Sequence, residues 1–178
     1  MTEQIRVVLA VARNPVLARV GLAYLVFNMA EYATWTAIVV YGYLLGGAAM
    51  AGIVILVQLV PAGLVAPFAA AAADRFRPDR VLLAAYLLIA AAFAVTAVTL
   101  YGGAAVPLTL GAATVAAMAI TLVRPIEAVI LPSITHRPAD LTAANTVSSL
   151  AETAGIFLGP LLAGVLLLRD QPADVFAA

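Results

Sequence analysis

Long apolar stretches, separated by short turns that are either charged or rich in glycine, make up most of this 178-residue chain. Residues 48–73 and 81–122 contain no charged side chain at all. A helix needs about 20 residues, rising about 1.5 Å each, to cross the hydrocarbon core of a bilayer, and five stretches reach that length. Their expected bounds are about 19–45, 48–73, 81–101, 106–131 and 141–168, and a sixth stretch begins at about residue 175. The pattern predicts an all-α membrane protein with five transmembrane helices and the start of a sixth.

The composition supports a lipid bilayer as the surrounding medium. Hydrophobic residues make up 65% of the chain and charged residues 10%, with a mean hydropathy of +1.11, whereas a soluble domain is about half apolar and a quarter charged. The formal net charge is zero, which gives no basic patch for nucleic acid. The chain has no cysteine, and its one histidine, His136, cannot form a metal site alone. With no nucleophile–base pair or phosphate-binding loop in the sequence, we expect neither an enzyme nor a bound cofactor or metal.

The turns between the apolar stretches indicate how the chain is inserted. The turn at residues 74–80 carries three arginines and two aspartates, whereas the turns at Gly46–Gly47 and Gly102–Gly103 carry no charge. Arginines also occur in and directly after residues 1–18, a leader that either forms a short interfacial helix or remains partly ordered. Because arginine is enriched on the cytoplasmic side of membrane proteins, we expect a multi-pass protein of the cell (inner or plasma) membrane with its N-terminus in the cytoplasm.

Three ionisable residues, Glu31, Arg124 and Glu152, lie well inside the expected spans. Counted from the cytoplasmic ends, they are roughly 15, 12 and 16 Å deep, which is one level near the middle of the membrane. A charge at that depth costs roughly 2.5 to 3.5 kcal/mol, so such residues face a protein interior or a wet cavity and are usually paired. Asn28 lies one turn before Glu31 on the same helix face, and Glu127 lies on the face of Arg124, nearer the cytoplasm.

These five residues are the candidate substrate- and proton-binding residues. Arg124 can neutralise one carboxylate, which leaves the other as a proton-binding site near neutral pH. The alternative is an architectural ion pair between helices with no role in binding. The surplus carboxylate favours the functional interpretation, because a structural pair would not need it.

Small residues recur in the fifth expected span at Gly155, Gly159, Ala163 and Gly164, mostly four positions apart. Such a stripe lets another helix pack backbone to backbone, and Pro160 adds a kink. Ordinary helix packing explains the spacing as well as a moving joint does.

Three short patterns, in this order, resemble motifs of the major facilitator superfamily of transporters. The turn at residues 73–82 resembles the family's loop signature, roughly G-x-L-A-D-R-F-G-R-R-R-V. It keeps the Ala-Asp-Arg-Phe core and departs from the signature at Ala70, Arg77, Pro78 and Asp79. Arg124-Pro-Ile-Glu127-Ala128 resembles the fourth-helix motif R-x-x-Q-G, with Glu and Ala at its last two positions. Residues 155–164 resemble the fifth-helix motif G-x-x-x-G-P-x-x-G-G of exporters and antiporters, with one glycine replaced by alanine.

The resemblance implies the N-terminal half of a twelve-helix fold that works by alternating access, so a C-terminal half-bundle would be a required partner. It implies that Glu31 and Arg124 face substrate or protons. It also implies that Asp74, Arg75 and Arg80 form a cytoplasmic latch. The fifth-helix motif, with Gly155, Gly159, Pro160 and Gly164, would sit where the two halves meet, and it points to export. Arg13-Asn14-Pro15 and the turn at Leu131-Pro132 resemble bacterial efflux proteins of the enterobactin-exporter type.

Two hypotheses from different classes follow. The first is a proton-coupled exporter of small apolar or amphiphilic molecules, in which Glu31 binds the coupling proton. The second is a truncated or split half-transporter that serves as a membrane anchor or sensor module without transport of its own.

Overall fold

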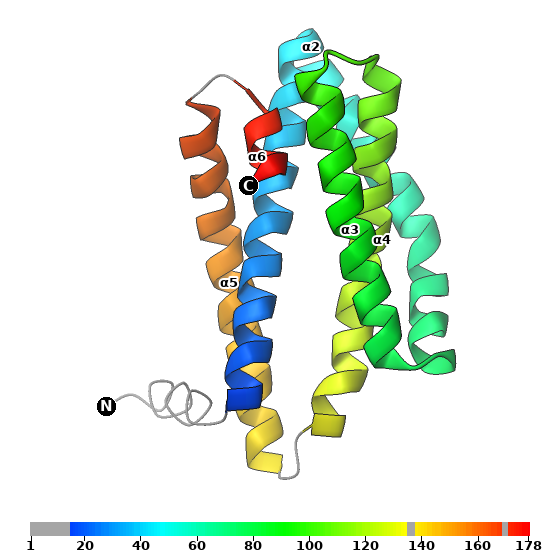
Figure 1. The fold of residues 1–178 in the computed structure, drawn as a ribbon, viewed down its shortest axis with the longest axis vertical. Helices are drawn as coiled ribbons and strands as arrows, with labels where there is room; N and C mark the ends of the chain where they lie inside the picture. Colours follow the sequence, from blue (N-terminus) through cyan, green and yellow to red (C-terminus); the bar gives the residue numbers. More distant parts are fainter. Residues whose placement is uncertain (1–14, 135–137, 169–170) are drawn as a thin grey trace.

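The computed structural model describes residues 15–134, 138–168 and 171–178, and this part of the chain is helical with no strand (Figure 1). The elements are α2 (Pro15–Arg75), α3 (Pro78–Tyr101), α4 (Val106–Ile134), α5 (Pro138–Leu167) and the short α6 (Ala173–Ala177). The expected helix in the leader, together with His136, lies outside the described residues.

Four of these helices are long and apolar enough to cross a membrane: Gly21–Ala69, Pro78–Tyr101, Val106–Ile130 and Leu141–Leu167. The predicted class, an α-helical membrane protein, is therefore supported. The helix bounds also fall within a few residues of the apolar stretches read from the sequence. Helix α4 continues through Pro132 to Ile134, three residues past the expected end of the fourth apolar stretch.

Helix α2 reverses direction at Gly46 and Gly47, and this break divides it into a first arm (15–45) and a second arm (48–75). Gly47 has φ +66°, a left-handed conformation that glycine adopts without steric cost. The two arms pack tightly next to the turn, since a Cβ placed on Gly42 would lie 2.9 Å from Val54 Cγ2. In Figure 1 the first arm rises to the turn and the second arm descends from it.

The next turn is equally short. Only two residues separate α2 from α3, which begins with Pro78 in its first turn, a position that needs no backbone N–H. Gly103, with φ +60°, helps the chain to turn from α3 into α4. Pro138 begins α5, so this helix also has a proline in its first turn.

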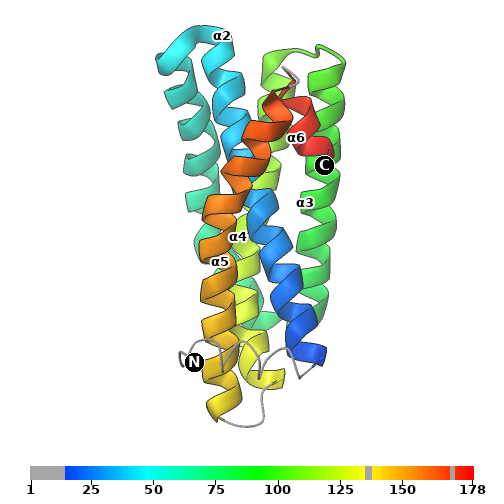
Figure 2. The same cartoon turned by 90° about the vertical axis from the view of Figure 1, so that its left-hand side faces the viewer.

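The first arm of α2 packs mainly against α5, and α3 packs mainly against α4, which also contacts α2 (Figures 1 and 2). The first arm and α5 run parallel with a constant offset: Gly21 lies against Val147, Gly155 against Asn28, and Gly159 against Tyr32. Residue n of the first arm is thus level with about residue n + 127 of α5.

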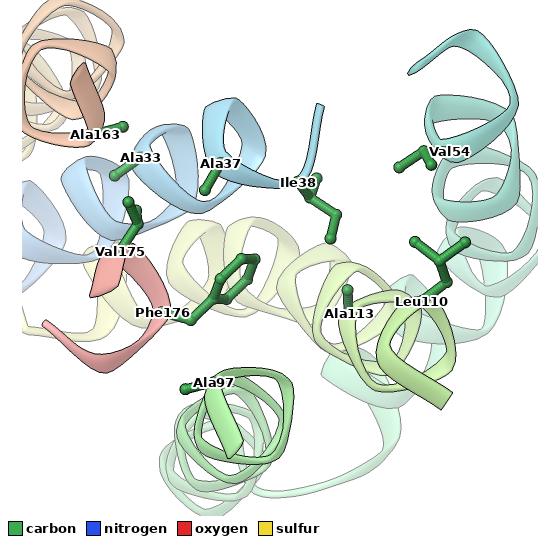
Figure 3. Packing of buried hydrophobic residues seen from close by; sticks show 10 residues of the cluster. All are labelled: Ala33, Ala37, Ile38, Val54, Ala97, Leu110, Ala113, Ala163, Val175 and Phe176. Carbon is green, nitrogen blue, oxygen red and sulfur yellow. The ribbon is translucent and has the colours of Figure 1, made fainter. Parts of the chain in front are cut away.

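Alanine dominates the interior of the bundle, while large side chains cover its outside. Half of the buried cluster in Figure 3 is alanine: Ala33, Ala37, Ala97, Ala113 and Ala163. By contrast, Phe68, Phe157 and Leu168 are at least 72% exposed. Lipid tails are as apolar as leucine, so membrane helices gain little by hiding large side chains and associate through small ones.

Helix α6 is anchored to this interior. Phe176 packs edge-on against Phe93 of α3, with ring centroids 5.8 Å apart, and Val175 is buried beside it. The Tyr101 hydroxyl at the end of α3 donates a hydrogen bond to Asp174. The helix begins at Ala173, two residues before the position expected for a sixth span.

Candidate functional site

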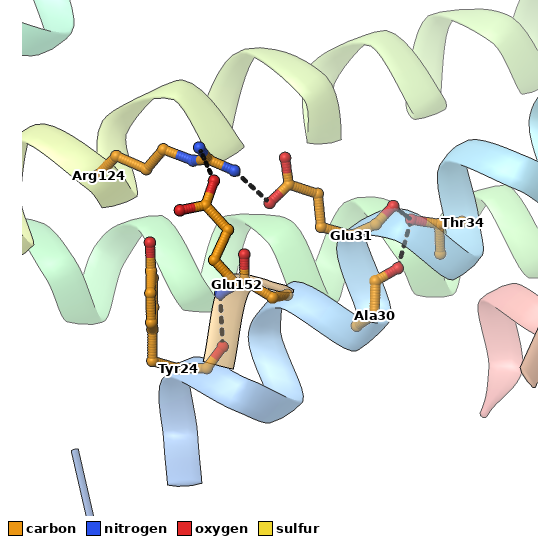
Figure 4. A network of polar contacts seen from close by, with 7 residues as sticks. Tyr24, Ala30, Glu31, Thr34, Arg124 and Glu152 are labelled. Atoms are coloured by element: carbon orange, nitrogen blue, oxygen red, sulfur yellow. Dashed lines mark hydrogen bonds and ion pairs between the residues drawn. The ribbon is translucent and has the colours of Figure 1, made fainter. Parts of the chain in front are cut away.

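The three ionisable residues singled out in the sequence meet in the structure. Arg124 of α4 lies between Glu152 of α5 and Glu31 of the first arm of α2 (Figure 4). One guanidinium nitrogen donates a hydrogen bond of 2.7 Å to Glu152 Oε1. The other lies 3.6 Å from Glu31 Oε2. Side chains from three different helices therefore form one ionic cluster within the apolar bundle.

The backbones that carry this cluster are not level, which corrects the expectation of a single depth. From the offset between the first arm and α5, Glu152 is level with about residue 25, six positions below Glu31. Six helical residues correspond to roughly 9 Å along the axis. Figure 1 shows the reason, because α5 starts well below the start of α2. The long side chains bring the charges together.

The two carboxylates have unequal environments. The Glu31 side chain is 12% exposed, against 35% for Glu152 and 43% for Arg124. Glu152 has the short, charge-assisted hydrogen bond, which is the stronger type of ion-pair contact. Glu31 Oε2 is buried and accepts no hydrogen bond from the part of the chain that the structure describes. The negative charge of Glu31 is thus less well compensated by Arg124 than the charge of Glu152 is.

Glu31 also lines a groove of about 660 Å³, which we name the central groove. Its walls come from both arms of α2, from α4 and from Pro160 of α5. The remaining lining is mostly aliphatic or aromatic: Tyr32, Trp35, Thr36, Val39, Val40, Leu59, Ala62, Ala117, Ile120 and Thr121. The groove is open to its surroundings rather than an enclosed chamber.

The hydroxyl groups of the two threonines in the groove are hydrogen-bonded within their own helices. Thr36 Oγ1 donates to the Tyr32 carbonyl at 2.8 Å, and Thr121 Oγ1 donates to the Met118 carbonyl at 2.7 Å. Hydroxyls that bond back to their own helix present mainly their methyl groups to the surroundings. Glu31 therefore supplies the one carboxylate in a lining that is otherwise mostly aliphatic or aromatic.

A second polar pair was missed by the sequence reasoning. Tyr86 of α3 donates a hydrogen bond of 3.4 Å to Glu127 Oε1, and its ring packs edge-on against Phe27. Glu127 therefore has its own partner on another helix, away from the lining of the central groove. The third span, expected to be nearly featureless, supplies this donor. The available signal was that Tyr86 is the one polar side chain in the first half of that span.

The structure does not place Asn28 at the groove, although it shares a helix face with Glu31 in the sequence. Asn28 is fully buried where the first arm meets α5. Its Nδ2 donates to the Tyr24 carbonyl at 2.8 Å. Asn28 therefore does not line the central groove with Glu31, because Gly155 of α5 packs against its Cβ and backbone.

The small residues of α5 fall on two faces. A Cβ on Gly155 would lie 2.5 Å from Asn28 Cβ, and one on Gly159 would lie 2.7 Å from Tyr32 Cβ, so both glycines are held against the first arm. Pro160 instead lines the central groove, and a Cβ on Gly164 would meet no atom within 4 Å. The resemblance implied that the whole motif sits where two half-bundles meet. For Gly155 and Gly159 the structure shows a contact inside this bundle instead.

The charged turn contains an ion pair that the loop signature does not predict. Arg77 Nη2 lies 3.0 Å from Asp79 Oδ2, and both side chains are more than 60% exposed. These two residues are among the departures from the signature, and they compensate each other's charge. Arg75 and Arg80 are exposed, while the side chain of Asp74 lies outside the described part, so the proposed latch stays a prediction.

Within residues 15–134, 138–168 and 171–178, no group of three or more metal-ligating side chains comes together. A scan against protein-family models, a search of curated proteins and a search of solved structures found no match for this chain. The four long apolar helices indicate a multi-pass α-helical membrane protein.

Proposed function

We propose that this chain is the N-terminal half of a membrane transporter of the major facilitator type, which exports small apolar or amphiphilic molecules in exchange for protons. The observation that carries the proposal is the cluster of Glu31, Arg124 and Glu152 beside the central groove. Each charge placed in the membrane costs roughly 2.5 to 3.5 kcal/mol. A cost of this size is expected where water, protons or cargo reach the charges.

The topology that we propose has five spans. A straight helix of the 61 residues of α2 would be about 90 Å long, three times the hydrocarbon core. Each arm, by contrast, has the length of one crossing, and the reversal at Gly46 and Gly47 would lie at the far surface. With α6 as the start of a sixth span, the arginine-bearing turn at residues 74–80 and the N-terminus would both face the cytoplasm of the cell membrane.

The open side of the central groove implies a partner. Alternating access needs a cavity that closes around its cargo, and the described helices wall the groove only in part. We propose that a second helical bundle covers the open side. The same observation favours the alternative in which this bundle alone anchors or senses without transport, because an uncovered groove cannot enclose cargo.

In the transport cycle, Glu31 would bind the coupling proton. Protonated Glu31 no longer attracts Arg124, which can then pair with Glu152 alone through the short hydrogen bond already present. Asp74, Arg75 and Arg80 would act at the cytoplasmic end. The tight contact of Gly155 and Gly159 with the first arm would keep α5 and α2 moving as one body.

The test is transport of a fluorescent amphiphilic dye into inverted membrane vesicles that carry the full protein and are energised by a proton gradient. Glu31→Gln is expected to fold normally and to lose gradient-driven transport, because the amide cannot bind and release a proton. Asp174→Asn, the same chemical change at a site remote from the groove, should transport normally. Undiminished transport by Glu31→Gln would remove Glu31 from the mechanism. No transport by the wild-type chain together with its second bundle would favour the anchor or sensor alternative.

A further inference from the structure

A much smaller pocket, which we name the inner pocket, lies inside the bundle between residues of α2, α3, α4 and α6. It offers about 10 Å³ of room, and a cavity needs roughly 10 to 15 Å³ to hold one water molecule. The inner pocket is therefore large enough for one water and too small for an organic ligand. Most of the residues that line it are buried: Thr34, Ile38, Gln58, Ala113, Ala116 and Phe176.

Gln58, on the second arm of α2, supplies the one amide side chain of the inner pocket. Its side chain belongs to a residue that is only 4% exposed. Its Nε2 is buried and donates a hydrogen bond to no atom of the residues that the structure describes. Burying an amide group without a hydrogen bond is unfavourable, and nearly all such groups in native proteins are bonded to protein or to an ordered water. The Gln58 amide therefore calls for an acceptor inside the pocket.

Thr34, on the first arm, lies level with Gln58 across the reversal of α2. Thr34 is 12 residues before Gly46 and Gln58 is 11 residues after Gly47, so both are roughly 17 Å from the turn along the two arms. The Thr34 hydroxyl donates its proton to carbonyl groups of its own helix, at 2.7 and 3.0 Å. Its oxygen retains lone pairs that can accept a hydrogen bond. One donor and one acceptor thus border the same small space.

We propose that the inner pocket binds one water molecule, which accepts a hydrogen bond from Gln58 Nε2 and donates one to Thr34 Oγ1. Buried waters make two to four such bonds to groups that would otherwise be unpaired. The water links the two arms of α2 deep inside the bundle. An ion fits less well, because none of the lining residues is charged. A cation would meet the N–H groups of the amide, and an anion would have no positive charge beside it.

The inner pocket lies directly behind the wall of the central groove, since Trp35 and Ala117 line both spaces. A reporter for the bound water must therefore be a residue that does not also face the groove. Phe176 meets this condition, because it lines the inner pocket only. Phe27 is equally buried, at 7% exposure, and belongs to a separate apolar cluster, so it serves as an internal reference.

The experiment is radiolytic footprinting of the full protein in nanodiscs, read by mass spectrometry. A brief X-ray pulse splits water into hydroxyl radicals, which oxidise the nearest side chains before they diffuse, so a bound water marks even buried neighbours. In the wild-type protein we expect Phe176 to be oxidised faster than Phe27. In Gln58→Leu, and in Thr34→Val, the rate at Phe176 should fall to that of Phe27.

Thr96→Val is the matched control variant for Thr34→Val. Thr96 is also a buried threonine whose hydroxyl bonds back to its own helix, at 2.8 Å, but it does not line the inner pocket. This variant should leave the rate at Phe176 unchanged. Helix content measured by circular dichroism identifies a variant that has not folded. If Gln58→Leu does not fold, Thr34→Val decides, because it replaces a hydroxyl by a methyl group of similar size.

Oxidation of Phe176 no faster than that of Phe27 in the wild-type protein would show that the pocket is dry and would overturn the inference. So would an unchanged rate at Phe176 in a folded Gln58→Leu or Thr34→Val variant. The inference does not rest on the proposed function, and the two fail separately. A protein that moves dye and has a dry inner pocket refutes the water site alone. A protein that holds the water and moves no dye refutes transport alone.

Discussion

The contact of α5 with the first arm of α2 leaves no room for a side chain at Gly155. A Cβ there would lie 2.5 Å from Asn28 Cβ, 2.9 Å from the Asn28 carbonyl carbon and 3.2 Å from its Cα. Two of these atoms belong to the backbone, so a rotamer change cannot relieve the clash. Gly155→Ala therefore has to push the two helices apart. Gly164, on the same helix, has no atom within 4 Å of its Cβ position and provides a matched control.

The size of the effect follows from the two substitutions together. Replacing glycine by alanine in a helix interior gains about 1 kcal/mol in helix propensity, and this gain applies equally to both positions. Overpacking at a tight contact costs about 1 to 3 kcal/mol and applies only to Gly155. We expect the free energy of unfolding of Gly155→Ala to be lower than that of Gly164→Ala by about 1 to 3 kcal/mol.

The measurement is unfolding of the purified chain in mild detergent by increasing fractions of dodecyl sulfate. Helix content can be followed by circular dichroism. Trp35, the only tryptophan in the sequence, reports fluorescence from the first arm. Unfolding of both variants at the same dodecyl sulfate fraction would show that the two helices do not meet at Gly155, and the arrangement of α2 and α5 would then be wrong.

Two further predictions concern the other polar contacts. Tyr86→Phe removes the donor to the partly buried carboxylate of Glu127, and we expect it to lower the free energy of unfolding by about 1 to 3 kcal/mol. Adding Glu127→Leu to this variant should recover most of the loss. No recovery in the double variant would contradict the pairing of Tyr86 with Glu127. Arg77→Ala breaks an exposed ion pair with Asp79, and we expect the midpoint of thermal unfolding to stay nearly unchanged because ion pairs at the solvent-exposed surface contribute little to stability. A large shift that disappears at high salt would show that this turn is held more tightly than its exposure indicates.

Much of the architecture could be read from the sequence, because bilayer thickness and helix rise fix the length of an apolar stretch. The positions of the turns could also be predicted from the sequence, since Gly47 and Gly103 adopt the left-handed conformations at which the helices end. The cluster of Glu31, Arg124 and Glu152 followed from the cost of burying an isolated charge. Counting residues gave one depth for all three, and this was wrong because it assumed that every helix starts level with the others.

The sequence could not show which neighbouring helix packs against each face of a helix. Periodicity places Asn28 and Glu31 on one side of a helix, but it does not say which neighbour covers which residue. Gly155 covers Asn28 and leaves Glu31 at the groove. The bond from Tyr86 to Glu127 joins residues 41 positions apart on two helices, and nothing in the spacing of either helix indicates it. Such pairings depend on the rotation of each helix about its axis, which only packing determines.

The small-residue contact and the charge cluster are parts of one arrangement. Glu152 lies one turn before Gly155 on α5, and Glu31 lies one turn after Asn28 on the first arm, so the glycine contact lies between the two acids along the bundle axis. A bulkier contact would move α5 outward and carry Glu152 away from the first arm. Arg124 bridges both acids beside this contact (Figure 4). We infer that the close approach of Gly155 and Gly159 to the first arm keeps both acids within reach of Arg124, at 2.7 Å for Glu152 and 3.6 Å for Glu31. The charge at the groove then depends in part on two residues that carry no charge and do not line the groove.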